Sequence, residues 1–146
     1  GSRMKKLLIT STLLLGTCLF GATEAETKSL VEETVKYCKS VSKNECLKAI
    51  DENKFENGEL FIFAFDYEAR GVANGKIKKI IGKKLWNLKN PDGMYVFREQ
   101  IRVAKQPNGG WLIYKWKTPK GTSIMKKSFI QDIDGSFYVG AGLTVK

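Results

Sequence analysis

The chain has 146 residues, of which 42% are hydrophobic and 11% aromatic, so it suits one globular domain with a buried core and excludes a disordered or multidomain chain. Lysine and arginine outnumber acidic residues by 25 to 15, and the formal net charge of +10 favours an anionic ligand, an anionic membrane surface or an acidic protein. Nucleic acid is disfavoured, because the lysines are spread along the chain. Histidine is absent, which removes the commonest general base and metal ligand, so we expect neither an enzyme nor a metal or other cofactor.

Residues 1–25 are typical of a leader. Gly1–Arg3 resembles a cloning scar, and a Met-Lys-Lys start is followed by an apolar stretch, Leu7–Ala22, that contains several Thr, Ser and Gly residues. A positive start, a short apolar run and small residues before the cleavage point indicate a secretory signal peptide rather than a membrane anchor. We therefore expect export to the periplasm, cleavage after Ala25 and a single domain over residues 26–146.

Three cysteines are present, and two of them fall in the predicted domain. Cys18 lies in a weak lipoprotein cleavage box within the leader, so lipidation, and with it membrane attachment, is the alternative to a freely exported protein. Cys38 and Cys46 favour a disulfide in an oxidising compartment. A continuous helix would hold them about 12 Å apart, too far for a bridge, so the bridge requires a helix break at Ser40–Asn44, with Asn44 able to cap a second helix. The alternative is a pair of free thiols in one helix.

The first half of the chain predicts two helices followed by a hairpin. Apolar residues at helical spacing indicate a helix over Glu24–Cys38 and a shorter one over Asn44–Asn53. Glu59–Phe65 is predicted as a strand, and Arg70–Gly75 as its return strand. Alternation sends two apolar sets to opposite faces of the first strand, so both faces must be covered. These sets are Phe61, Phe63 and Phe65, and Leu60, Ile62 and Ala64.

The second half predicts a long excursion, a helix and three strands. The Lys-rich excursion covers Lys76–Gly93, and Met94–Lys105 has helical spacing and is expected to cross the sheet. The closing strands are expected at Trp111–Lys117, Ile124–Asp132 and Ser136–Val145, with a tight turn at Asp134-Gly135. The order predicts an α+β domain with one antiparallel sheet of about five strands, an N-terminal helix pair and a crossing helix.

Polar groups interleaved with aromatic residues on the closing strands predict a pocket. Leu112, Tyr114 and Trp116 share one face of their strand, and the alternative is that they are plain core. The Tyr114 hydroxyl and the Trp116 indole N–H need partners when buried, and Asn74 and Lys126 can approach them. A buried ammonium is costly without an anion, so an inward Lys126 predicts a ligand carboxylate.

Short motifs along the chain resemble, in order and spacing, the type-2 single Cache domains. They are GVANG at Gly71–Gly75, LKNPDG at Leu88–Gly93, GWLIYKW at Gly110–Trp116, KKSFI at Lys126–Ile130 and GAG at Gly140–Gly142. The resemblance runs from about Phe55 to Val145. It implies a PAS-like sheet, a pocket under the excursion, and recognition of small carboxylates by the sensing part of chemoreceptors and kinases.

The resemblance also implies site residues. Carried over by position, these are Asn74, Tyr114, Trp116 and Lys126, with Phe61 and Phe63 as an apolar floor and Arg98 as a further anion contact. Two positions depart from the family pattern: Met125 replaces a proline and Phe129 a tyrosine, so we expect one polar contact to be lost. The chain ends at Lys146, at the last strand, so signalling is expected to require a partner protein such as a sensor kinase or chemoreceptor.

The leading hypothesis is a free-standing periplasmic Cache domain that binds a short-chain carboxylate and presents the bound state to a partner. The alternative is a basic interaction module with a vestigial pocket, which docks an acidic protein or a membrane surface.

Overall fold

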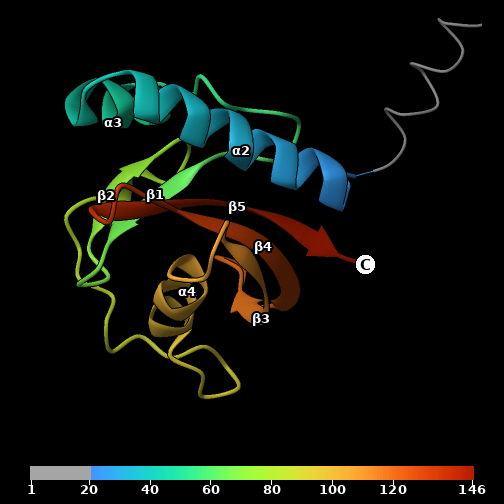
Figure 1. The fold of residues 1–146 in the computed structure, drawn as a ribbon. Helices are drawn as coiled ribbons and strands as arrows, with labels where there is room; N and C mark the ends of the chain where they lie inside the picture. The colour runs from blue at the N-terminus through green and yellow to red at the C-terminus, as the bar shows by residue number, and fades with distance from the viewer. Residues whose placement is uncertain (1–20) are drawn as a thin grey trace, which may run out of the picture.

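A computed structural model describes residues 21–146 as three layers (Figure 1). Helices α2 and α3 cover one face of a five-stranded sheet, and helix α4 with the long excursion covers the other. The predicted cloning scar, most of the apolar leader and Cys18 lie outside the described residues. Within residues 21–146, none of the helices has the length and apolar character needed to cross a bilayer.

Helix α2, Glu24–Ser40, begins at a capping box. The Thr23 hydroxyl accepts a hydrogen bond from the Glu26 backbone at 3.1 Å, and the Glu26 carboxylate accepts one from the Thr23 backbone at 3.1 Å. These bonds satisfy two amides that the helix itself leaves unpaired. Cleavage after Ala25, as the sequence predicts, would remove Thr23 and Glu24 from this helix start.

Helix α3, Lys43–Asp51, begins one residue earlier than its predicted start. Its cap is Ser42 and not Asn44: the Ser42 hydroxyl accepts a hydrogen bond from the backbone of Glu45 at 3.2 Å. The cap position needs an extended backbone, and Ser42 has it whereas Asn44 already lies inside the helix. The predicted helix break is therefore present, but the residue that caps the second helix differs.

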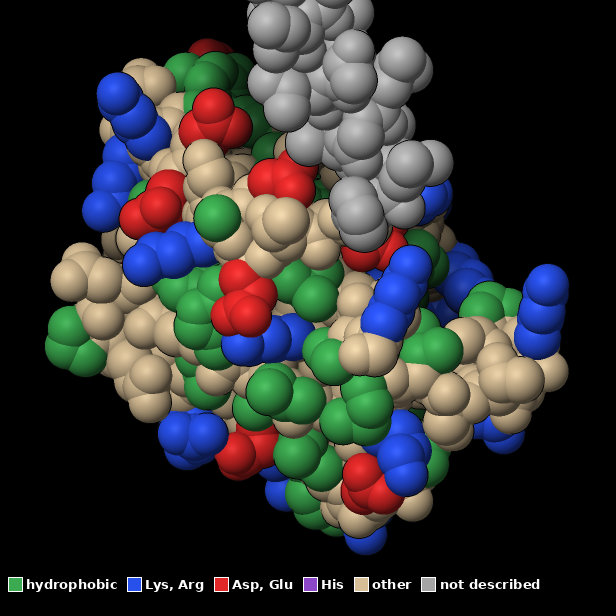
Figure 2. Space-filling model, turned by 90° about the vertical axis from the view of Figure 1, so that its right-hand side faces the viewer, with side chains coloured by type: hydrophobic (Ala, Val, Ile, Leu, Met, Phe, Trp, Pro, Cys, Tyr) green, Lys and Arg blue, Asp and Glu red, His purple; other side chains and the backbone are tan. Residues whose placement is uncertain are grey.

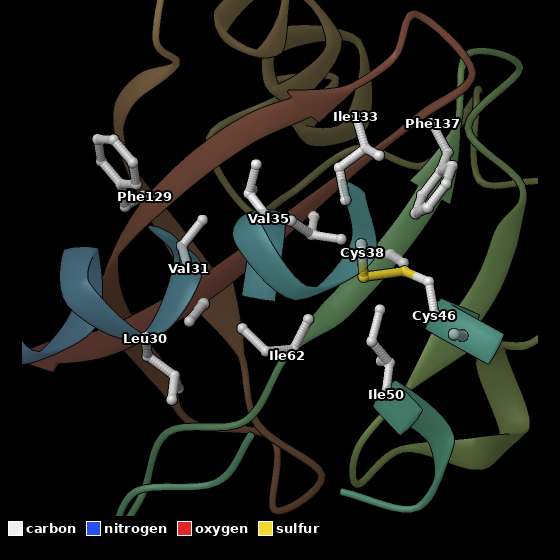
Figure 3. Close-up of a cluster of buried hydrophobic side chains, with 14 of the residues drawn as sticks. Leu30, Val31, Val35, Cys38, Cys46, Ile50, Ile62, Phe129, Ile133 and Phe137 are labelled. Atoms are coloured by element: carbon white, nitrogen blue, oxygen red, sulfur yellow. A yellow bond between two sulfur atoms is a disulfide. The ribbon is translucent and has the colours of Figure 1, made fainter. Parts of the chain in front are cut away.

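This break brings two cysteines together (Figure 3). Val41 is extended, α3 turns back against α2, and the Cα atoms of Cys38 and Cys46 are 4.8 Å apart in a disulfide. Both side chains are buried in the core on the α2 side of the sheet. The bridge therefore joins the two helices of this layer at their inner face.

The sheet has the strand order β2-β1-β5-β4-β3, and all neighbouring strands are antiparallel. The strands are β1 Phe63–Asp66, β2 Gly71–Asn74, β3 Gly110–Lys117, β4 Ser123–Ile133 and β5 Phe137–Val145. Asp134 and Gly135 turn the chain between β4 and β5 with positive φ values of 52° and 68°. The α+β class and the five antiparallel strands predicted from the sequence are confirmed.

Strand β1 starts later than its predicted start at Glu59. Asn57 and Leu60 instead exchange two backbone hydrogen bonds, of 3.1 and 2.9 Å, around a turn at Gly58. These backbone groups are consequently not available to the sheet.

Two hydrophobic clusters fill the space on the two faces of the sheet. The first packs under α2 and α3 and is drawn in Figure 3; the second packs under α4. Leu60, Ile62 and Ala64 belong to the first cluster, whereas Phe63 and Phe65 belong to the second. The alternation predicted for this segment is therefore correct, and it continues through residues that precede the strand.

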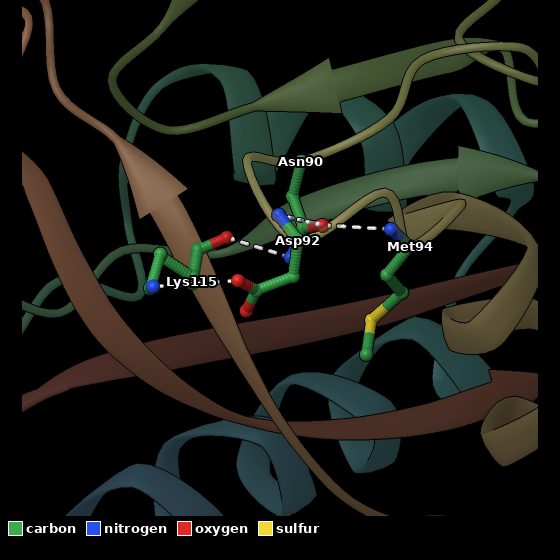
Figure 4. Close-up of polar contacts among 4 residues, drawn as sticks. All are labelled: Asn90, Asp92, Met94 and Lys115. Atoms are coloured by element: carbon green, nitrogen blue, oxygen red, sulfur yellow. Dashed lines mark hydrogen bonds and ion pairs between the residues drawn. The ribbon is translucent and has the colours of Figure 1, made fainter.

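The excursion is attached to the sheet by Asn90, which is buried (Figure 4). Its side-chain oxygen accepts hydrogen bonds from the backbones of Asp92 and Met94, at 3.1 and 2.8 Å, and its amide nitrogen donates to the Lys115 carbonyl at 3.0 Å. An ion pair of 3.3 Å between Asp92 and Lys115 adds to this connection. The turn thus leads directly into α4, Val96–Ala104, which crosses under the sheet as expected.

Replacing both bridged cysteines, as in Cys38→Ser/Cys46→Ser, should lower the free energy of unfolding. The bridge joins residues with a sequence separation of 8. Closing so short a loop stabilises a fold by roughly 2.5 kcal/mol through the entropy of the unfolded chain. Urea unfolding monitored by circular dichroism measures the loss. The Cys18→Ser variant, which retains both bridged cysteines, is the matched control, and equal stability of the two variants would contradict the prediction.

Candidate functional site

A cavity of about 180 Å³ lies between the sheet, α4 and the start of the excursion. Six aromatic side chains form most of its wall: Phe61, Phe63, Phe65, Phe97, Tyr114 and Trp116. Four polar side chains also face it, namely Asn74, Gln100, Lys126 and Ser128, and two isoleucines of the excursion, Ile77 and Ile80, lie over it. Ligand pockets commonly measure about 300–1,000 Å³, so this cavity suits a small metabolite.

Strand register decides which side chains form the cavity floor. Tyr114 on β3 is paired with Lys126 on β4, and Lys126 with Thr144 on β5. The next row toward the sheet centre contains Ser128 opposite Gly142. Because side chains alternate between the faces of a strand, these rows all point toward α4.

The amine of Lys126 is incompletely neutralised. Its Nζ donates to the Thr144 hydroxyl at 3.2 Å, and none of the ion pairs formed within residues 21–146 includes it. Burial lowers the pKa of Lys126, the charge of Glu59 opposes this shift, and the charge of Lys76 adds to it. A half-buried ammonium with a hydroxyl as its hydrogen-bond partner is suited to receive an anion.

Two buried tyrosine hydroxyls, one lining the cavity and one bonded to a lining residue, are already paired. The Tyr114 and Ser128 hydroxyls share a hydrogen bond of 2.9 Å, and the Tyr138 hydroxyl donates to the Gln100 side-chain oxygen at 2.9 Å. Burial raises the pKa of both tyrosines, so both remain neutral near pH 7. These pairs stabilise the floor without adding charge to it.

Asn74, at the end of β2, connects the cavity to the excursion. Its side-chain oxygen accepts hydrogen bonds from the backbones of Lys76 and Ile77, at 2.9 and 2.6 Å. These two bonds fix the orientation of the amide, so its NH₂ group is the side that remains for another partner. The Asn74 backbone also donates to the Asp51 carboxylate of α3 at 2.9 Å. The same residue therefore faces the cavity and sets the path of the chain over it.

Close packing holds the aromatic wall in place. The ring centroids of Phe65 and Phe97 are 4.7 Å apart, and those of Tyr114 and Trp116 are 6.0 Å apart. Gly140 on β5 lies under the Phe63 ring: a Cβ atom there would be 2.5 Å from the nearest ring carbon. Only glycine at this position leaves the ring where it is.

Six of the seven ligand-binding candidates face one cavity, and Arg98 is the exception. On α4, Phe97 and Gln100 share the inward face, and Arg98 is rotated away from it by about 100°. The Arg98 guanidinium lies 3.7 Å from the Tyr95 ring centroid and donates to the Trp86 carbonyl at 2.9 Å. The structure therefore places Arg98 with the outer part of the excursion and outside the cavity.

The two departures from the family pattern also lie away from the cavity. Met125 and Phe129 alternate with Lys126 and point to the α2 face of the sheet. Phe129 is buried there against Trp111, with ring centroids 5.1 Å apart. The expected loss of a polar contact from the pocket is therefore wrong in its geometry, because neither side chain reaches the pocket face.

Sequence reasoning missed several cavity residues. Ser128 lies two positions after Lys126 on the same strand, so period-two alternation could have identified it. Gln100 lies three positions after Phe97, so helical spacing could have placed it. Ile80 ends a single 3-10 turn, Lys78–Ile80, and Ile77 precedes it, so no periodic pattern of the sequence places them over the cavity.

A larger and shallower hollow, of about 570 Å³, lies between the C-terminal ends of α2 and α4 and the β4–β5 turn. Within it the Tyr67 hydroxyl donates to the Asp132 carboxylate, and the Lys105 amine lies 5.5 Å from the Tyr67 ring centroid. We assign the candidate site to the smaller cavity because its wall is mostly aromatic and its amine, Lys126, is half-buried, whereas Lys39 and Lys105 in the larger hollow are exposed.

Comparisons with known proteins agree with this architecture. The sequence profile of the Cache domain family matches residues 24–146. A methyl-accepting chemotaxis protein from Vibrio parahaemolyticus RIMD 2210633 has a similar fold, with a TM-score of 0.70, 18% identity and 97% of each chain covered. The periplasmic sensor domain of a chemotaxis protein gives a TM-score of 0.63 and 23% identity over 81% of this chain and 87% of that one. A Cache chemosensory domain described for carboxylic acid recognition gives 0.62 and 20% over 81% and 85%.

Gly140→Ala should destabilise the domain and disturb the cavity. The added methyl group would overlap the Phe63 ring, which must then move into the cavity. Overpacking of this kind lowers the free energy of unfolding by about 1–3 kcal/mol, which thermal or urea unfolding would measure. Adding Phe63→Leu to Gly140→Ala removes the overlapping ring, so the double variant should regain part of the stability. If the stability losses of Gly140→Ala and Phe63→Leu simply add in the double variant, the methyl group and the ring do not overlap.

Lys126→Met should change how stability depends on pH. The folded-state pKa of Lys126 lies below the ordinary value of 10.5, so the unfolded chain binds more protons between these two values. The free energy of unfolding of the wild type should therefore rise relative to that of Lys126→Met as pH increases toward 10.5. Urea unfolding of both proteins from neutral to alkaline pH measures this difference. A constant difference across the range would show that burial does not shift this group.

Proposed function

Because this chain belongs to the Cache domain family of extracytoplasmic sensor modules, we propose that it binds a small organic anion in the aromatic cavity. The observation that carries the proposal is Lys126, an amine half-buried among aromatic side chains with the Thr144 hydroxyl as its hydrogen-bond partner. An anionic ligand would supply the counterion that the described residues do not.

The cavity favours a short-chain carboxylate. The carboxylate accepts hydrogen bonds from the Lys126 amine and from the Asn74 NH₂ group, whose own oxygen is occupied by backbone amides. The short apolar tail packs against Phe61, Phe63 and Trp116. The volume of about 180 Å³ limits this tail to a few carbon atoms. Charge-assisted bonds orient the ligand, and aromatic burial adds affinity.

The proposed role is sensing and not catalysis. The hydroxyl of Ser128 faces the cavity but is paired with the neutral Tyr114 hydroxyl and not with a base. A serine without an adjacent general base is a weak nucleophile. The chain is proposed to be exported to the periplasm by the leader in residues 1–25 and to pass the bound state to a chemoreceptor or sensor kinase.

A panel of short-chain carboxylates tests the proposal, with Lys126→Met and Lys127→Met as a matched pair. The two lysines are neighbours on β4, but Lys127 points to the α2 face, where it pairs with Glu24. Carboxylates should raise the melting temperature of the wild type and of Lys127→Met. Loss of a charge-assisted hydrogen bond should weaken binding to Lys126→Met roughly 10- to 100-fold in calorimetry.

The corresponding primary amides, which have the same shape without the charge, serve as ligand controls. If the amides bind as tightly as the acids, or if both lysine variants bind with equal affinity, the cavity does not recognise the negative charge of the ligand through Lys126. The absence of any response to the panel at millimolar concentration would overturn it.

A further inference from the structure

The outer part of the excursion, residues 76–89, carries one sign of charge. This segment, termed here the basic loop, has the sequence KIKKIIGKKLWNLK, with six lysines and no acidic residue. All six lysines are exposed, and none of the ion pairs among residues 21–146 involves them. By contrast, acidic and basic side chains are mixed on the face shown in Figure 2. The basic loop thus carries six positive charges that no acidic side chain of the segment offsets.

The basic loop also exposes large apolar side chains between its lysines. Ile77, Ile81, Trp86 and Leu88 are 38%, 37%, 36% and 43% exposed, and these four account for most of the large apolar side chains exposed in residues 21–146. A shallow hollow of about 460 Å³ lies beside Trp86 and Leu88 and is also lined by Lys84. Exposed apolar groups clustered in one segment indicate a contact surface.

Hydrogen bonds from the folded core hold this loop in shape. The Arg70 guanidinium donates to the Gly82 carbonyl at 2.8 Å, and the Leu85 backbone donates to the Ala69 carbonyl at 2.8 Å. The Arg98 guanidinium donates to the Trp86 carbonyl and lies 4.9 Å from the Trp86 ring centroid. Because the backbone is already fixed, docking orders little additional chain.

We propose that the basic loop docks on the surface of an anionic lipid bilayer. Lysine amines beside tryptophan, leucine and isoleucine suit the boundary between headgroups and acyl chains, where the amines meet phosphates and the apolar groups insert. Anionic lipids attract each lysine near the surface. The core of a protein interface is depleted in lysine, so this composition favours a bilayer over an acidic protein.

The basic loop borders the ligand cavity, but its docking to a bilayer does not depend on ligand binding. Most of the basic loop lies on the α4 side of the sheet (Figure 1), and Lys78 at its start contacts the end of α3. Ile77 extends from the loop to the cavity, whereas Trp86 and Leu88 do not line it. The alternative hypothesis combined membrane docking with a vestigial pocket. Docking through the basic loop is compatible with a pocket that binds its ligand.

Vesicle co-sedimentation of the full chain tests the proposal. Vesicles of phosphatidylcholine alone are compared with vesicles that also contain phosphatidylglycerol, at low and high salt. The variant Lys79→Gln/Lys83→Gln/Lys84→Gln removes charge from the loop. Its matched control, Lys36→Gln/Lys39→Gln/Lys48→Gln, removes the same charge from α2 and α3 on the other side of the sheet. The apolar leader is common to all these proteins, so its contribution cancels.

We expect salt-sensitive binding to anionic vesicles. Loss of three loop lysines should lower the partition coefficient on the order of 100-fold, and the matched control should lower it much less. Leu88→Ser should lower it by about 10-fold, since it removes an inserted side chain. Anionic vesicles should also shift the tryptophan emission to shorter wavelength, and Trp86→Phe should remove most of that shift.

Several outcomes would overturn the proposal. These are no binding to anionic vesicles, a loss in the loop variant that is equal on phosphatidylcholine alone and on anionic vesicles, and equal losses in the loop variant and its control. Polyglutamate is included as a competing acidic chain. If the loop variant loses affinity for polyglutamate but not for vesicles, the surface recognises an acidic protein and the bilayer proposal fails. The carboxylate thermal shift, measured on the same variants, shows independently whether the ligand site is intact.

Discussion

The register of β3, β4 and β5 is the constraint on which the rest of the structure depends. Because three long antiparallel strands are paired residue by residue, each side chain is assigned to one of two faces. One face carries Tyr114 and Lys126 toward α4, and the other carries Phe129 toward α2. A shift of β4 by one residue would turn Lys127 toward α4 and Lys126 toward α2. The site therefore depends on the same pairing that forms the core.

The cavity combines two environments that oppose each other energetically. Its aromatic wall favours dry, apolar contents, whereas the Lys126 amine favours water or an anion. Gly140 and Gly142 allow this arrangement, since a Cβ atom at either position would overlap the Phe63 ring or the Ser128 hydroxyl. A small organic anion with a short apolar tail satisfies both environments at once.

The excursion connects the cavity to the helices on the other side of the sheet. Asn74 fixes the start of the excursion, and the Lys78 amine donates to the carbonyl groups of Asn74 and Asp51. Asp51 ends α3, and α3 is joined to α2 by the disulfide. A contiguous set of contacts thus leads from the segment over the cavity to the helix pair. The outer side of the same excursion presents the exposed lysines and apolar groups of the basic loop.

The sequence by itself determined the order of the elements and the sidedness of the strands, because the periods of 3.6 and two residues are local properties of the chain. The six ligand-binding candidates that face the cavity came from the resemblance of its motifs to Cache domains. It also identified the helix break that a bridge between Cys38 and Cys46 requires. Only the tertiary structure decided that Arg98 lies with Trp86, that Gln100 faces the cavity, and that Ile77 lies over it. The rotation of α4 and the path of an irregular excursion are set by contacts between residues far apart in the chain, and no local pattern encodes them.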